Sequence, residues 1–340
     1  MKLEIKESEN IFDAILRSTG SVELALEYLV SANDSDAFDW NVVAGDEIET
    51  GTDVDLDFVV LDLFKKNGFS PSNTIGSSVD PITEFVDPNA LDADVRLFVD
   101  AANLIDESQI TAIDNFVLGL KSNNLWSKMV AIYPYVGGTL ASHKFNLKDP
   151  RDADDAFRLN FVGDWIHDNF GVVPNGSDCH ADTFLIPSNE FASGDNYSYG
   201  LFITDNPDVV SAEIGANETF SNFLWTRSYT ETYLFIAGGA GINTNLSPYK
   251  GLISMSRTDN LSTKLYLNGD LKNNSVSYTG AAGAATCSFY IGARNDSSTP
   301  SYFSAKRQKL TYFSHGLTNA EMSIFAGLVT AYEIELSRNT

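Results

Sequence analysis

From about Ala156 onward, the sequence consists largely of short runs in which apolar and polar residues alternate. Alternation with a period of two is typical of β-strands that bury one face. About ten such strands, separated by turn-forming residues, predict a mainly β fold, a sandwich or jelly roll, and not a parallel α/β sheet. The clearest runs are 157–161, 184–186, 199–203, 233–236, 251–255, 264–267, 288–292 and 309–313, and the clearest turns are 174–176, 205–207, Asn268-Gly269 and Asn295-Asp296.

Helical patterns flank this region on both sides. Residues 92–102 carry apolar side chains at helical spacing, and a second helix is expected to begin at Asp106 and to end near Asn123. Residues 316–322 are expected to lead into a last helix, which would contain Glu333 and Glu335. We therefore expect residues 105–340 to form one β-sandwich domain with an N-terminal helix and a C-terminal helix.

The first part of the chain is expected to form a small α+β domain over residues 1–66. Leu3 and Ile5 alternate with polar residues and indicate a short strand. Two helices are expected between residues 11 and 33, and a turn leads to a second strand that includes Ile48. Residues 67–104 are expected to form a linker, rich in Pro and Gly up to residue 90, followed by a helical connector.

Residues 7–14, 30–33 and 44–48 resemble the LysM family. In that family a Gly-Asp or Gly-Gln turn precedes the last strand and an Asn closes the second helix, as Gly45-Asp46 and Asn33 do here. LysM domains usually bind N-acetylglucosamine polymers, and similar domains in phage tails and baseplates look like docking modules. The resemblance implies a docking role for residues 1–66, with sugar binding as the alternative.

The second half resembles the concanavalin A-like lectin and laminin-G sandwich. The hairpin Leu265-Tyr266-Leu267-Asn268-Gly269 and the later strand 289–294 are similar to this family. The segments 125–139, 143–159 and 316–322 look like a family of phage-encoded proteins with the same sandwich. The resemblance covers residues 105–340 and implies a phage origin and a lectin-like fold.

The charge of the chain narrows the possible partners. The chain has 46 acidic and 22 basic side chains, and residues 1–100 hold 22 of those acids but only 6 of the bases. Nucleic acid binding needs a basic surface, so we do not expect it as the main activity. No run of 18 apolar residues occurs and the first residues lack an apolar signal region, so neither membrane insertion nor a signal peptide is expected.

The two resemblances together imply a structural component of a bacteriophage virion, in the tail, the baseplate or an appendage. We expect the protein to be made in the host cytoplasm, to bind other virion proteins, to form homo-oligomers on a symmetric particle and to adhere to host-surface glycans. Two alternatives remain: a glycan depolymerase, and a structural spacer or decoration protein on the head or neck.

The sequence does not favour catalysis. Glycosidases with this sandwich use two acids that alternate on one strand, and retaining enzymes hold them ~5 Å apart. The Glu residues after position 150 do not pair with another acid in that way on a β segment. No catalytic residue is therefore expected, and neither a nucleophile elbow nor a phosphate-binding Gly loop occurs.

Three groups of residues are candidates for binding. Trp225, Tyr229 and Tyr233 could form a platform on which a sugar stacks, although aromatic residues in a β region usually belong to the core. Asp178, His180 and Asp182 could place three ligands for a divalent cation on one strand face, or could be a polar edge. The alternating acids Asp53, Asp55 and Asp57 lack the Gly of a calcium loop, so no cofactor is expected there.

Overall fold

The computed structural model describes residues 2–4, 47–49, 91–191, 195–204, 210–227, 231–236, 240–244, 250–259, 262–275 and 284–338. The chain divides into two units, Met1–Phe85 and Val86–Thr340. In the first unit, β1 (Lys2–Glu4) pairs antiparallel with β2 (Glu47–Glu49). These are the two strands that the sequence predicts for this domain. The helices predicted between residues 11 and 33, and the acids at 53–57, lie outside the described residues.

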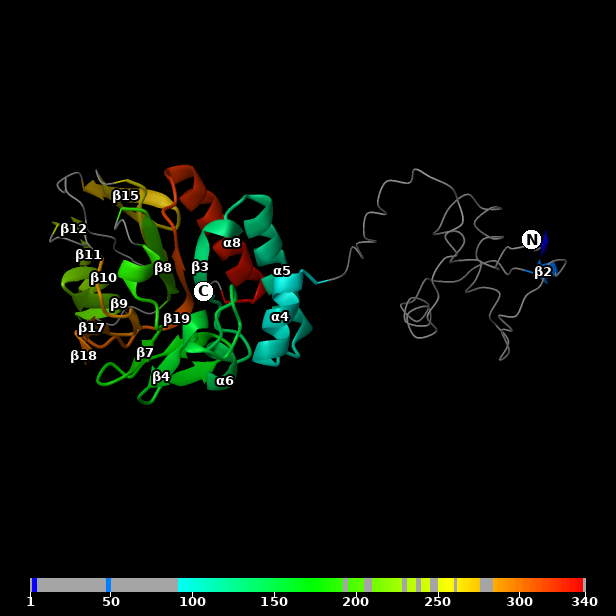
Figure 1. Ribbon diagram of the computed structural model, residues 1–340, viewed down its shortest axis with the longest axis horizontal. Helices are drawn as coiled ribbons and strands as arrows, with labels where there is room; N and C mark the ends of the chain where they lie inside the picture. Colours follow the sequence, from blue (N-terminus) through cyan, green and yellow to red (C-terminus); the bar gives the residue numbers. More distant parts are fainter. Residues whose placement is uncertain are drawn as a thin grey trace. The chain divides into compact units, whose positions relative to one another are not determined.

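The second unit is a β-sandwich of two sheets (Figure 1). Apart from β17 on β9, which is parallel, the paired strands are antiparallel. In the described residues the nine-stranded sheet holds β4 (Asn160–Val162), β7 (His180–Asp182), β9 (Ser211–Glu218), β10 (Phe220–Arg227), β11 (Glu231–Ile236), β12 (Ala240–Thr244), β16 (Tyr290–Ile291), β17 (Arg294–Asp296) and β18 (Thr299–Ser301). The eight-stranded sheet holds β3 (Met129–Tyr133), β5 (Ile166–Asp168), β6 (Gly171–Val173), β8 (Tyr197–Ile203), β13 (Gly251–Arg257), β14 (Thr263–Leu267), β15 (Asp270–Ser275) and β19 (Gln308–Ser314). The mainly β sandwich predicted from the sequence is confirmed.

A first hydrophobic core lies between the two sheets. Ile214 and Ala181 of the nine-stranded sheet are buried in one cluster with Leu201 and Ile253 of the eight-stranded sheet. Because strand residues alternate between faces, every second residue of these strands enters this core. Burial of this apolar area holds the sheets together.

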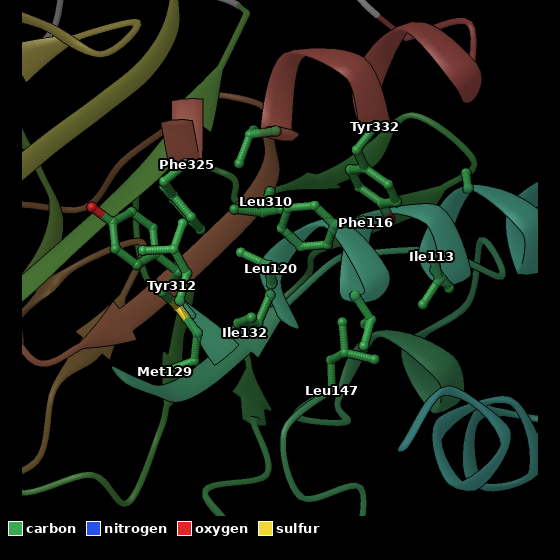
Figure 2. Packing of buried hydrophobic residues seen from close by; sticks show 14 of the residues in the cluster. Ile113, Phe116, Leu120, Met129, Ile132, Leu147, Leu310, Tyr312, Phe325 and Tyr332 are labelled. Carbon is green, nitrogen blue, oxygen red and sulfur yellow. The ribbon is translucent and has the colours of Figure 1, made fainter. Parts of the chain in front are cut away.

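A second hydrophobic core lies between the eight-stranded sheet and a layer of helices. The helices are α4 (Ala93–Ala102), α5 (Glu107–Ser122) and α8 (Asn319–Glu335). Figure 2 shows Phe116 of α5 and Phe325 of α8 beside Leu310 and Tyr312 of β19. The rings of Tyr312 and Phe325 lie 4.4 Å apart between centroids. This layer covers the face of the eight-stranded sheet that points away from the first core.

The helix boundaries follow from capping residues. Asp106 caps α5 by accepting hydrogen bonds from the backbone N–H groups of Ser108 and Gln109. Thr318 and Glu321 form a capping box at the start of α8. The start of α5 agrees with the sequence prediction, and Glu333 and Glu335 lie in α8 as predicted. No helix in the described parts of the chain is long and apolar enough to cross a membrane.

Three local predictions differ from the structure. Residues 184–186 form no strand, because Phe184 has a φ of +55° and breaks the extended backbone. The turn expected at Asn295-Asp296 is wrong, since both residues lie in β17 and the chain reverses at Ser297-Ser298. The run 157–161 forms a strand only from Asn160 onward, because Phe157 has a φ of +59° at the end of a short 3-10 helix (Asp154–Ala156).

Candidate binding face of the nine-stranded sheet

The face of the nine-stranded sheet that points away from the first core, called here the outer face, is polar and aromatic. Ala181, Ile214, Ala216 and Ile291 all point into the core between the sheets. Their neighbours along each strand therefore point outward. The outward residues are His180 and Asp182 of β7, Gly215 and Asn217 of β9, Tyr290 of β16, and Arg294 and Asp296 of β17.

Asn217 and Asp296 form the centre of a hydrogen-bond network on this face. They are register partners in the parallel pair of β9 and β17. The Asn217 Nδ2 atom donates to Asp296 Oδ1 at 2.6 Å, and Ser221 Oγ donates to Asn217 Oδ1 at 2.5 Å. The second carboxylate oxygen of Asp296 accepts hydrogen bonds from Arg294, at 2.7 Å, and from Ser301. The amide and the carboxylate are thus fixed in orientation before any ligand arrives.

The carboxyl group of Asp296 is held as an anion. Burial alone would raise its pKa, but the hydrogen bonds from Arg294, Ser301 and Asn217 outweigh burial. The pKa of Asp296 is therefore lowered below its ordinary value. At neutral pH this side chain can only accept hydrogen bonds.

Tyr302 lies beside this network with its ring partly open to solvent. Tyr302 is 43% exposed. The Arg294 guanidinium lies over the Tyr302 ring, 4.6 Å from the ring centroid. Arg294 in turn lies over Gly215, where a Cβ would come within 2.9 Å of its Cγ atom. The absence of a side chain at Gly215 therefore lets Arg294 reach both Asp296 and Tyr302.

The hairpin that carries these groups has an unusual backbone. Ser297 and Ser298, at the turn between β17 and β18, have φ values of +48° and +72°. Tyr302, just after β18, has a φ of +54°. Non-glycine residues in this region cost roughly 1–3 kcal/mol each and concentrate at binding and catalytic sites. Three of them within six residues mark this hairpin as a candidate site.

The three predicted metal ligands do not converge. Asp178 accepts a hydrogen bond from the Asn175 amide at 2.6 Å, and Asp182 accepts one from the backbone of Phe184 at 2.9 Å. The His180 ring stacks on Tyr290 with 4.6 Å between centroids. Across the described segments, no group of three His, Cys, Asp or Glu side chains is arranged to hold a metal ion. His180 and Asp182 belong to the outer face instead.

The backbone register brings two of the three predicted sugar-binding aromatics together. Trp225 of β10 is directly opposite Tyr233 of β11 in the nine-stranded sheet. Tyr229 lies outside the described residues. The sequence did not single out Asn217, Asp296 or Tyr302, and the aromatic and amide residue types near 295–302 were the only available signal.

Two buried glutamates after position 150 are held in ion pairs. Glu213 pairs with Lys306 at 2.9 Å, and Glu333 pairs with Arg338 at 2.7 Å. All four side chains are buried, and the Glu213–Lys306 pair also bonds to Ser211 and Ser304. These carboxylates tie strands and the C-terminal segment together, and water does not reach them.

No family model matches this chain, and no curated protein matches it. The fold is similar to domain 4 of an extracellular GH43 arabinanase from Geobacillus stearothermophilus, in complex with arabinotriose, at 14% identity and a TM-score of 0.40, over 58% of this chain and 98% of that chain. It is similar to botulinum neurotoxin type C, which depends on two ganglioside molecules to enter cells, at 12% identity and a TM-score of 0.45, over 61% of this chain.

A third similar structure is the Trypanosoma rangeli sialidase in complex with sialic acid. The identity is 13% and the TM-score 0.44, over 60% of this chain. The present chain spans 53% of the matched neurotoxin chain and 34% of the matched sialidase chain.

Proposed function

We propose that the sandwich binds glycans on the outer face of its nine-stranded sheet, at Tyr302, Asn217 and Asp296. The observation that carries this proposal is a partly exposed tyrosine ring beside an amide and a carboxylate that are already fixed in place. Binding sites for small molecules combine apolar or aromatic surface with a few polar groups that fix orientation. The outer face supplies both within one hairpin and one neighbouring strand.

The chemistry of this face suits a sugar. A sugar ring has an apolar C–H face that can pack on an aromatic ring, and hydroxyl groups that both donate and accept hydrogen bonds. Tyr302 offers the ring, and the Asn217–Asp296 pair offers a donor and an acceptor. Trp225 and Tyr233 are register partners on neighbouring strands of the same sheet.

We further propose that this sandwich is carried on a bacteriophage particle. The resemblance of residues 1–66 to a LysM-like docking module, and the acidic character of the first 100 residues, support an anchoring role for the N-terminal unit. Repeated copies on a symmetric particle would turn weak contacts with single sugars into firm adhesion to a host surface. Deletion of residues 1–66 should abolish incorporation into particles, and unchanged incorporation would place the anchor elsewhere.

Glycan binding is tested with the full chain on an array of host-surface glycans. We expect Tyr302→Ala to lose binding, because the aromatic platform is removed. Phe170→Ala is the matched control: Phe170 is 54% exposed, but it lies between β5 and β6 on the other sheet. If both variants bind as the unmodified protein does, the outer face is not the site. Release of reducing sugar from a bound polysaccharide would instead indicate a depolymerase.

A further inference from the structure

We propose that the outer face selects neutral glycans that present two neighbouring hydroxyl groups, and that it rejects acidic ones. This inference rests on the proposed glycan binding and adds the class of ligand. It follows from counting which hydrogen-bonding positions of Asn217 and Asp296 are already used, and from the charges that surround them.

One donor position on the Asn217 amide and one acceptor position on the Asp296 carboxylate lie next to each other without a partner among the described residues. Asn217 uses one N–H of its amide on Asp296 and its carbonyl oxygen on Ser221. Its second N–H has no hydrogen-bond partner among the described residues. Asp296 Oδ1 accepts one hydrogen bond, from Asn217, whereas Oδ2 accepts two. Since each carboxylate oxygen can accept two hydrogen bonds, one position on Oδ1 remains.

Two neighbouring hydroxyls fit these positions. The two N–H bonds of the Asn217 amide point in different directions. A single ligand atom therefore cannot both accept from the second N–H of Asn217 and donate to Oδ1 of Asp296. One sugar hydroxyl can accept from Asn217 while the next hydroxyl on the ring donates to Asp296. An anionic group of a ligand can only accept hydrogen bonds. It could accept one from Asn217, but its negative charge would be repelled by the Asp296 carboxylate.

The surrounding charges disfavour an acidic ligand as well. Asp182 adds a further carboxylate from β7. Burial lowers the pKa of His180, so its ring is neutral at pH 7. Arg294 is a cation on this face, and it is ion-paired with Asp296 at 2.7 Å. In the described part of the face, negative groups therefore outnumber positive ones.

The test compares polysaccharides that differ in charge. The full chain is titrated with galactan, mannan and dextran, and with the acidic polymers polygalacturonate, alginate and dextran sulfate. We expect binding to at least one neutral polymer and no binding to the acidic ones. Binding of a neutral ligand should change little between low and high salt, because salt screens charge–charge interactions but not hydroxyl contacts.

The variant Asp296→Asn separates this inference from the proposed function. It keeps the shape of the side chain, removes the negative charge and releases Arg294 from its ion pair. We expect neutral binding to weaken about ten-fold, as for loss of one hydrogen bond to a charged group, and acidic polymers to gain measurable binding. A melting temperature close to that of the unmodified protein shows that the fold is intact.

The outcomes are distinct. Preferential binding of acidic polymers by the unmodified chain, lost in Tyr302→Ala, would overturn the inference and leave glycan binding in place. Binding of no polymer by the unmodified chain would overturn both. Neutral binding that Asp296→Asn leaves unchanged would overturn the assignment of Asp296 as the hydroxyl acceptor.

Discussion

The Nδ1 atoms of His143 and His167 lie 3.0 Å apart, and the Nε2 atom of each ring is buried without a hydrogen-bond partner among the described residues. One ring must donate to the other, so at least one Nδ1 carries no proton. The pair joins the short helix α6 (Leu140–His143) to the edge strand β5. Asp168, next to His167, forms an ion pair with Arg307 of the segment that leads into β19.

This pair should make the sandwich sensitive to acid. Burial, together with the nearby His167 and Arg338, lowers the pKa of His143 to about 3, although Asp168 raises it somewhat. In the unfolded chain this histidine has a pKa near 6.5. Between about pH 6.5 and pH 3, therefore, only the unfolded state takes up the proton, and the free energy of unfolding falls progressively over that range. The loss is about 1.4 kcal/mol per pH unit for one such group. Urea unfolding at pH 7.5, 6 and 5 measures it.

The variant His143→Gln should reduce this pH dependence, because it removes the side chain whose pKa is lowered in the folded state. Carboxylates also contribute in acid, so the difference between the two proteins is the quantity that counts. His315→Gln serves as the control, since His315 contacts Phe191 rather than the pair. An identical slope in His143→Gln and the unmodified protein would show that the pair is not the source.

The C-terminal segment should depend strongly on Arg338. Its guanidinium is buried, bonds to both carboxylate oxygens of Glu333 and donates to the carbonyl oxygens of Pro134, Tyr135 and Lys309. Arg338→Ala leaves the Glu333 charge buried without its partner, which we expect to cost about 3–5 kcal/mol of unfolding free energy. Arg151→Ala, which removes two exposed ion pairs, with Asp149 and Asp155, should leave the thermal midpoint unchanged. Equal effects of the two changes would contradict this account.

The hairpin at Asn268-Gly269 should not tolerate a branched side chain. Asn268 and Gly269 have φ values of +52° and +84°, which is the backbone of a type I′ turn. A Cβ at Gly269 would also come within 2.9 Å of Ala326 on α8. Gly269→Val should therefore lower the unfolding free energy by at least roughly 1–3 kcal/mol. Gly327→Ala is the control, because nothing lies within 4 Å of its Cβ position and alanine favours a helix.

Limited proteolysis should cut the chain first between residues 67 and 90. This segment has few apolar side chains that could be buried, and it contains Pro71, Gly76, Pro81 and Pro88. The division between the two units also falls within it, at residues 85 and 86. Mass spectrometry should find a fragment that begins near residue 90 and persists. Loss of that fragment as fast as the whole chain would argue against independent units.

The sequence predicted the elements whose signals are local. Asp106 marked the start of α5 correctly, and Asn268-Gly269 marked its turn, because capping and turn formation depend on a few adjacent residues. β3 was not predicted, because Met129–Tyr133 is almost continuously buried, with Ile132 in one core and Ala131 in the other, and such a run does not alternate. The turn near residue 297 was misplaced, because two serines at positive φ give no such signal.

The candidate site could not be predicted for a different reason. Asn217 and Asp296 are 79 residues apart and meet only through the parallel pairing of β9 and β17. Gly215 matters because Arg294 lies over it, which is again a long-range relationship. Contacts between residues that are far apart in the chain leave no local sequence pattern by which they could be predicted.

The most direct test of the account is the affinity of the full chain for a neutral host polysaccharide, measured by calorimetric titration with Tyr302→Ala and Phe170→Ala alongside. The account predicts that Tyr302→Ala loses at least about ten-fold in affinity, as expected for removal of a stacking aromatic ring, while Phe170→Ala binds as the unmodified protein does. Equal affinities for all three proteins would contradict a glycan site on the outer face.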